Sequence, residues 1–145
     1  MAVDDALDSL LKSYIPKYER TFERDNTSFA LKIKLARSLK LLQTRALKLI
    51  DIIRGIRNDF AHNLDIYHFD SIDKKKKDKL IKIFRETHPD DDYQSYSISK
   101  MFSIVVTDMF AILSAQATQL KVAKEYIYSD DFQLKIKEII KDNSY

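Results

Sequence analysis

The sequence predicts an all-α protein, an antiparallel bundle of four to five main helices that forms a single domain over residues 1–145. Glycine and proline are scarce, with one Gly and two Pro in the chain, whereas the many turns of an all-β protein need such residues. Hydrophobic residues make up 45% and charged residues 32%, which is typical of a globular protein. Along most of the chain, apolar residues recur at spacings of three and four, as on the buried face of a helix.

Two helices are expected in the N-terminal third. The first covers Val3–Arg24, and Pro16 is expected to kink or break it because proline lacks the N–H that a helix interior needs. Thr27 or Ser28 is expected to cap the second helix by accepting a hydrogen bond from one of its first N–H groups. The apolar residues of this second helix lie three apart, with further apolar residues beside them: Ala30, Ile33, Ala36 and Leu39, flanked by Phe29, Leu35 and Leu42.

The central and C-terminal helices are separated by polar segments. A short turn near Gln43 and Thr44 precedes the third helix, and a loop, Asn63–Asp70, precedes the fourth. A polar, acidic connection, His88–Ser95, then leads to a long fifth helix, and Ser129 or Asp130 is expected to cap the last one. The expected limits of these helices are Arg45–Ala61, Ser71 or Asp73 to Thr87, Ser97–Tyr126 and Asp131–Lys141, the last with a buried stripe of Phe132, Ile136, Ile139 and Ile140.

Composition excludes several classes of protein and favours the cytoplasm. The chain has no Cys, so it has neither a disulfide framework nor thiol chemistry. Its N-terminus is acidic and is not expected to be a signal peptide. The most apolar segment, Met101–Ala117, contains Thr107 and Asp108 and is interpreted as a buried helix, too short and too interrupted to span a membrane.

The formal net charge of +3 does not by itself predict nucleic-acid binding, but the basic residues are clustered. Lys74–Lys77 is a run of four lysines, and a second cluster on one helix comprises Lys32, Lys34, Arg37 and Lys40. The simplest interpretation of each cluster is a solvated helix face. His88 and the row of acidic residues Asp90–Asp92 are likewise expected in a solvated loop.

The third helix carries the candidate site. At about 100° per residue, its apolar residues Leu49, Ile53, Ile56 and Phe60 share one face. On the opposite side, Arg54, Asn58 and His62 are spaced by four and stack in a row. Arginine binds phosphate, and histidine is the side chain best suited to exchange protons near neutral pH. This combination indicates a phosphodiester site.

The helical period places Arg57 about 140° around the helix from His62, so the two side chains diverge in an unbroken helix. They would converge if the helix frayed at Ala61, or if the helix packed against its mate in a homodimer. Gly55, which costs a helix about 1 kcal/mol relative to Ala, is either a tolerated defect or a point where another backbone or a ligand comes close.

The segment Arg57-Asn58-Asp59-Phe60-Ala61-His62 resembles the R-x(4–6)-H motif of the HEPN superfamily, including the polar residue that often follows the arginine. A narrower resemblance, to bacterial MltR-type mannitol operon repressor proteins, covers about a third of the chain, Ser28 to about Asp70. HEPN proteins are small helical bundles, and many are metal-independent ribonucleases of toxin–antitoxin and other defence systems. The resemblance therefore implies a HEPN-like bundle and RNA as the substrate.

In that family reading, Arg57 and His62 are the catalytic pair and Asn58 is their polar companion, while Arg54 is added from helix geometry as a substrate-binding residue. The RNA 2′-hydroxyl attacks the neighbouring phosphorus, His62 transfers a proton and Arg57 stabilises charge on the phosphoryl oxygens. No metal or other cofactor is required. The expected partners are RNA, a second copy of the chain and an antitoxin or regulatory protein, with no membrane involved.

Competing interpretations stand beside this one. Arg57 would instead form a surface ion pair with Asp51, Asp59 or Asp65, and His62 would cap the end of its helix, where the dipole favours a cation. A metal site formed by His62, His68, Asp65 and Asp70 is disfavoured because these residues lack a helix-defined ligand spacing. Functionally, the alternatives are a non-catalytic MltR-like regulator or interaction module, and a HEPN-like protein that binds nucleotide or a second protein without cleaving.

Overall fold

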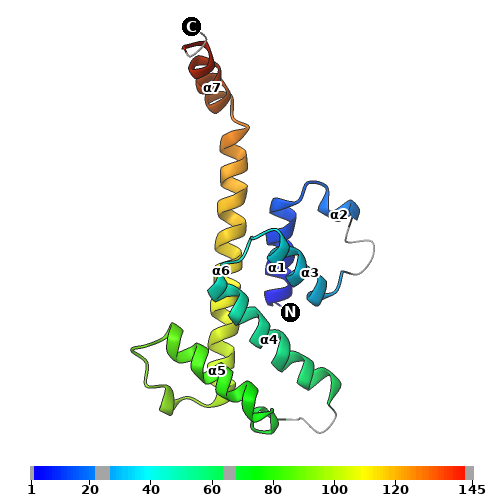
Figure 1. Cartoon of the computed structure of the whole chain (residues 1–145), viewed down its shortest axis with the longest axis vertical. Coiled ribbons are helices and arrows are strands. Elements are labelled where there is room, and N and C mark those ends of the chain that lie inside the picture. Colours follow the sequence, from blue (N-terminus) through cyan, green and yellow to red (C-terminus); the bar gives the residue numbers. More distant parts are fainter. Residues whose placement is uncertain (1, 22–26, 64–67, 143–145) are drawn as a thin grey trace.

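The computed structural model describes residues 2–21, 27–63 and 68–142, and these residues form helices and no strands (Figure 1). The all-α prediction is therefore confirmed. In chain order the elements are α1 (Ala2–Tyr14), α2 (Tyr18–Thr21), α3 (Phe29–Ser38), α4 (Thr44–His62), the 3-10 turn η2 (Phe69–Ser71), α5 (Lys74–Thr87), the 3-10 turn η3 (Tyr93–Ser95), α6 (Ile98–Ile127) and α7 (Asp130–Asp142).

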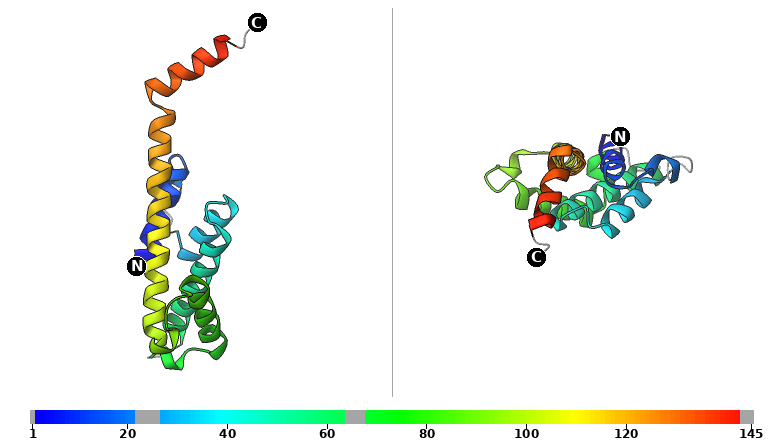
Figure 2. Two further views of the ribbon diagram at one scale, coloured as in Figure 1. Left: turned by 90° about the vertical axis from the view of Figure 1, so that its left-hand side faces the viewer. Right: turned by 90° about the horizontal axis from the view of Figure 1, so that it is seen from above.

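The long helix α6 is the axis of the fold and packs against α1, α4 and α5, and its contact with α1 reaches Lys124, whose ammonium donates to Tyr14 O (Figures 1 and 2). α1 runs in the same direction as α6, whereas α4 runs in the opposite direction. The core between them is entirely apolar among the described residues. Its central side chains, all fully buried, include Leu7 and Leu10 of α1, Leu49 and Ile53 of α4, Leu80 and Phe84 of α5, and Val105 and Met109 of α6.

Several predicted helix starts are confirmed by their capping hydrogen bonds. The hydroxyl of Ser28 accepts from Leu31 N at 3.3 Å, and the Asp73 carboxylate accepts from Lys75 N at 2.9 Å. Ser129 Oγ likewise accepts from Phe132 N at 3.3 Å at the start of α7. These short polar side chains satisfy N–H groups that have no partner inside the helix.

The first helix ends earlier than predicted. α1 ends at Tyr14, two residues before Pro16, because the residue preceding a proline is driven out of the helical conformation. Lys17 adopts a left-handed backbone with φ 57°, and the short α2 follows. The part of the predicted helix over 22–24 lies outside the described residues. Pro16 thus breaks the helix rather than kinking it.

The second predicted helix also stops short, at Ser38. Lys40 takes the left-handed conformation, φ 55°, and two reversed hydrogen bonds close the helix end, Leu41 N to Ala36 O at 2.9 Å and Lys40 N to Arg37 O at 3.0 Å. This is the Schellman pattern, in which glycine normally supplies the positive φ. Leu42 therefore lies beyond α3, although it is still buried in the core.

The last turns of α6 and α7 form an arm that extends beyond the other helices (Figures 1 and 2). Phe132 packs edge-on against Tyr126, with ring centroids 5.3 Å apart. The buried stripe predicted for the last helix is wrong at Ile136, which is 37% exposed, and the side chains of Ile139 and Ile140 lie outside the described residues. The arm has a partly apolar surface because no other described element covers it.

In the described part of the chain, α6 is the one helix long and apolar enough to cross a membrane. The helix extends well beyond the predicted apolar segment Met101–Ala117, so the length of that segment does not limit the length of the helix. A core helix of a soluble protein passes the same test, so the finding is weak evidence for a span. Consistent with a core role, Met101, Val105 and Leu113 are buried against the neighbouring helices.

A partly buried ion-pair cluster joins α1 to α3. The Lys32 ammonium lies 3.1 Å from both Asp4 Oδ1 and Asp8 Oδ1. Burial opposes the charge on Asp8, but the hydrogen bonds from Lys32, Lys12 and Tyr18 outweigh it and lower the pKa of Asp8 below its ordinary value of 3.8. Burial also opposes the charge on Lys32, yet its two carboxylate neighbours raise the pKa of Lys32 above 10.5.

Lys32→Met is expected to lower the free energy of unfolding by about 1–3 kcal/mol at neutral pH, because it leaves two part-buried carboxylates without their shared cation. Because the pKa of Asp8 is lowered, its ionised carboxylate stabilises the fold above pH 3.8, and this stabilisation is lost as the pH falls below that value. Because the pKa of Lys32 is raised, its ammonium stabilises the fold below pH 10.5, and this stabilisation is lost as the pH rises above that value. Urea unfolding should thus show the wild-type advantage narrowing outside this window, while Lys34→Met, at an exposed position of α3, has little effect. An equal loss at every pH would contradict this account.

Candidate functional site

α4 carries all the residues predicted for the site and holds them on one continuous helix. It runs unbroken from Thr44 to His62, close to the predicted Arg45–Ala61. Leu49, Ile53 and Ile56 are fully buried, so the predicted core face is confirmed there, and the partly buried Phe60 packs edge-on against Phe69 at 5.0 Å. The opposite face, with Arg54, Asn58 and His62, consequently points to solvent.

The structure places the predicted residues differently along that face. Asn58 and His62 are exposed and Arg54 is half-buried. Arg57 is also exposed, and its guanidinium lies over the ring of Phe29 on α3, 5.3 Å from the centroid. Such a cation–π contact restrains the side chain without neutralising its charge.

Within one chain, Arg57 and His62 do not converge. The helix stays intact through Ala61 to His62, so the two positions remain about 140° apart around the axis. The structure therefore does not bring Arg57 and His62 together through a frayed helix end. A site that uses both side chains on one phosphate has to be completed by a second copy of the chain.

The acidic residues beside the row are paired with other cations. Asp51, one of the three suggested partners of Arg57, pairs with Arg37 Nη2 at 2.8 Å. Asp59 accepts from the ammonium of Lys76, which also donates to Gly55 O at 3.1 Å. The third, Asp65, lies outside the described residues. Within the described ranges 27–63 and 68–142, neither Arg54 nor Arg57 has an ion-pair partner.

The contacts of Lys76 were missed by the sequence analysis, which interpreted Lys74–Lys77 as solvated. Lys76 and Lys77 are half-buried, and Lys77 caps the preceding turn by donating to Asp70 O at 2.5 Å. A lysine run gives no signal for which of its members turn inward, because that depends on how α5 packs against α4. Lys74 and Lys75 are exposed, as predicted for a solvated face.

Gly55 does not bring another part of the described backbone close. A β-carbon added there would lie 3.9 Å from Lys76 Cε, an ordinary van der Waals contact. Gly55→Ala is therefore expected to raise the free energy of unfolding by about 1 kcal/mol, since alanine is the better helix former and fits without displacement. Thermal unfolding measures this gain, and a loss of stability would show that the position needs glycine. Ser38→Ala, at the exposed end of α3, is a control for the assay.

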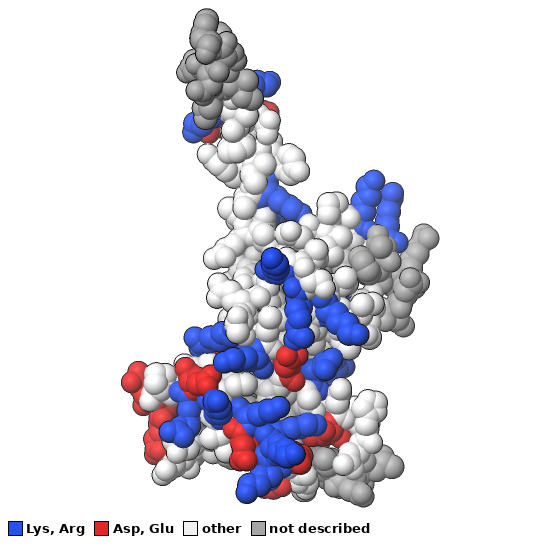
Figure 3. Space-filling view, viewed as in Figure 1, with Lys and Arg blue, Asp and Glu red and all other residues white. Residues whose placement is uncertain are grey.

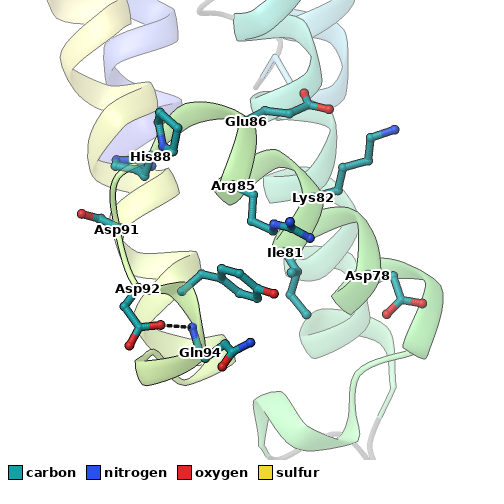
Figure 4. Close-up of a pocket in the computed structure, with 11 residues that line it drawn as sticks. Asp78, Ile81, Lys82, Arg85, Glu86, His88, Asp91, Asp92 and Gln94 are labelled. Carbon is teal, nitrogen blue, oxygen red and sulfur yellow. Dashed lines mark hydrogen bonds between the residues drawn. The ribbon is translucent and has the colours of Figure 1, made fainter.

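A second concave region lies between α5 and the segment that follows it (Figure 4). This cavity has a volume of about 950 Å³ and is lined by side chains of both charges, including Asp78, Lys82, Arg85 and Asp92. The Arg85 guanidinium lies over the Tyr93 ring at 4.7 Å, so the most prominent cation is already engaged. The mixed charges give no preference for an anionic or a cationic ligand.

His88 is a structural residue rather than part of a solvated loop, contrary to the prediction. Its ring stacks on Phe84 at 4.7 Å, its Nδ1 lies 2.8 Å from Thr87 Oγ1, and its Nε2 lies 3.4 Å from Asp108 Oδ2 on α6. These contacts fix the end of α5 against α6. Across the described residues, no group of three or more His, Cys, Asp or Glu side chains is arranged to hold a metal ion.

Comparison with protein-family models, with curated proteins and with solved structures finds no match to this chain. The resemblance to the HEPN superfamily and to MltR-type proteins therefore stays a prediction from the residues of α3 and α4. The chemistry of the candidate site has to be argued from its own geometry.

Proposed function

We propose that this protein is a metal-independent endoribonuclease of HEPN type that acts in the cytoplasm in a toxin or defence role. The observation that carries the proposal is the solvent face of α4. It presents two arginines, an asparagine and a histidine, while the neighbouring carboxylates of Asp51 and Asp59 are held by Arg37 and Lys76. Guanidinium groups without a carboxylate partner are suited to bind a phosphodiester.

The reaction is an internal transfer at phosphorus. The 2′-hydroxyl loses its proton and forms a bond to the adjacent phosphorus, and the bond from phosphorus to the 5′-oxygen breaks as that oxygen gains a proton. His62 acts in this proton transfer, and Arg57 of the second copy stabilises charge on the non-bridging oxygens. Asn58 orients the phosphate or the imidazole, and Arg54 binds the strand.

The direct test is incubation of the purified protein with mixed RNA in the presence of EDTA. Fragments that end in a 2′,3′-cyclic phosphate, formed without metal, are the expected result. Light scattering on the same sample should give the mass of a homodimer, because one chain cannot bring Arg57 and His62 together. A strictly monomeric protein, or a folded dimer without cleavage activity, would overturn the proposal.

A second function, an MltR-like regulator or interaction module, is favoured by the surface of the arm. Apolar side chains are exposed there without cover from any other described element, at Val122, Tyr126, Ile127, Tyr128 and Leu134. Exposed apolar patches of this kind mark protein interaction sites. An antitoxin or regulatory protein bound on the arm is compatible with either function, and the absence of cleavage would select this one.

A further inference from the structure

The positive charge of this protein is concentrated on one helix. α5 holds seven of the 25 Lys and Arg residues and only two of the 22 Asp and Glu residues, so its formal charge is +5. The rest of the chain, with 18 basic and 20 acidic residues, carries a formal charge of −2. The net charge of +3 is therefore distributed unevenly along the chain, with the positive charge on α5. Figure 3 shows Lys and Arg side chains gathered over the face formed by α4 and α5.

A groove runs between these two helices. Two cavities, of about 270 and 340 Å³, lie between α4 and α5 and share Lys48 and Ile83 in their lining, so they adjoin. We call this feature the α4–α5 groove. Its basic lining residues are Arg45 and Lys48 from α4, and Lys76 and Lys79 from α5.

The charge in the groove is only partly compensated. Of its acidic residues, Asp51 is paired with Arg37, and Glu86 lies 3.7 Å from Lys48 in an exposed pair. Exposed pairs of this kind contribute little and exchange readily for another anion. Arg45 and Lys79 have no ion-pair partner in the part of the chain that the structure describes, and both are exposed to solvent. The groove is thus suited to a linear polyanion.

The groove leads to the candidate site. Gly55 lines it, and residues three and four positions apart on a helix are neighbours, so Asn58 of the row lies directly beyond Gly55. We propose that the α4–α5 groove holds the phosphate backbone of a single RNA strand, with Arg45 and Lys79 each contacting one phosphate, and directs it toward Asn58 and His62. This inference rests on the proposed function for its ligand. Cavities of this size have room for one strand rather than for a duplex.

The experiment measures binding without cleavage. A fluorescent 2′-O-methyl oligoribonucleotide, which lacks the attacking hydroxyl, is titrated with the full-length protein over a series of KCl concentrations. The test variant is Arg45→Gln with Lys79→Gln, and the matched control is Lys121→Gln with Lys137→Gln, which removes the same charge from exposed positions of the arm. Circular dichroism checks that both variants are folded.

The slope of log affinity against log salt should fall by about 1.4 in magnitude for the groove variant, about 0.7 for each lost phosphate contact, and stay unchanged for the control. An equal fall of this slope in both variants would show that the protein attracts RNA diffusely and would overturn the proposal that the groove binds the strand. Binding to vesicles that contain phosphatidylserine, without binding to the oligonucleotide, would overturn it in favour of a membrane surface.

The groove and the proposed function fail separately. If the groove variant cleaves RNA in EDTA at the wild-type kcat/KM, the proposal that the groove binds RNA is contradicted, whereas the proposed ribonuclease activity is supported. Groove-dependent binding of the 2′-O-methyl strand, with no cleavage of ordinary RNA, would remove the ribonuclease and leave the groove as a site for a bound strand.

Discussion

His62→Ala is expected to lower the rate of RNA cleavage by about 10²–10⁴-fold, the usual contribution of one general acid–base group. The side chain is exposed at the last residue of α4 and makes no hydrogen bond to another described residue, so the thermal midpoint should hardly change. Cleavage of a defined oligoribonucleotide in EDTA measures the rate. Full activity in a folded His62→Ala protein would remove His62 from the chemistry.

His68→Ala is the matched control. His68 is also exposed and precedes η2 without capping it through its side chain. Its removal tests whether the loss of any surface imidazole lowers the measured rate. The rate of this variant should equal that of the wild type, and a comparable loss would show that the assay does not report on the α4 site.

A mixing experiment tests whether two copies share the site. Arg57→Ala and His62→Ala are each expected to be inactive, since each lacks one member of the pair. In a mixed dimer one composite site loses both residues and the other retains both, so co-expression should restore about a quarter of wild-type activity in a randomly mixed population. Without restoration, Arg57 and His62 of different copies do not act together.

Phe84→Ala is expected to lower the free energy of unfolding by about 3–5 kcal/mol, a large part of the stability of a small domain. Among the described residues, Phe84 is the largest fully buried side chain. It lies in the core between α5 and α6, stacks on His88 and meets Tyr96 edge-on at 5.6 Å. Its truncation leaves a cavity and removes the ring that holds the end of α5.

Urea unfolding followed by circular dichroism measures this loss. Phe110→Ala removes the same atoms from α6 at a position that is 44% exposed, so it should cost only a fraction as much. Similar losses in the two variants would contradict the assignment of Phe84 to the core. The ring contacts of Phe84 are with His88 and Tyr96 and not with the row on α4. Phe84→Leu should therefore keep the fold and the RNA cleavage rate.

Helices and their polar starts were predictable because those signals are local. Ser28, Asp73 and Ser129 cap helices as expected, since a short polar side chain finds its N–H partner within three residues. Helix ends were less predictable. α3 stops at a left-handed Lys40 rather than at a glycine, and nothing in the residue type of a lysine announces that conformation.

The candidate site was predicted as far as one helix allows. Its periodicity placed Leu49 and Ile53 in the core and Asn58 and His62 in solvent, as the structure has them. The ion pairs of the neighbouring acidic residues were not predictable. Asp51 and Asp59 pair with Arg37 and Lys76, which lie on other helices, and not with the arginines of α4. Such pairs depend on the packing of α3 and α5 against α4.

The sequence by itself determined the all-α class, most helix starts and the outward row on α4, because these depend on turn chemistry, capping and a 3.6-residue period. Only the tertiary structure decided that Lys76 turns inward, that Arg45, Lys48 and Lys79 line one groove, and that the arm of α6 and α7 is uncovered. The physical reason is that charge pairing and surface exposure depend on which helices become neighbours, and that choice is made by the packing of the whole core.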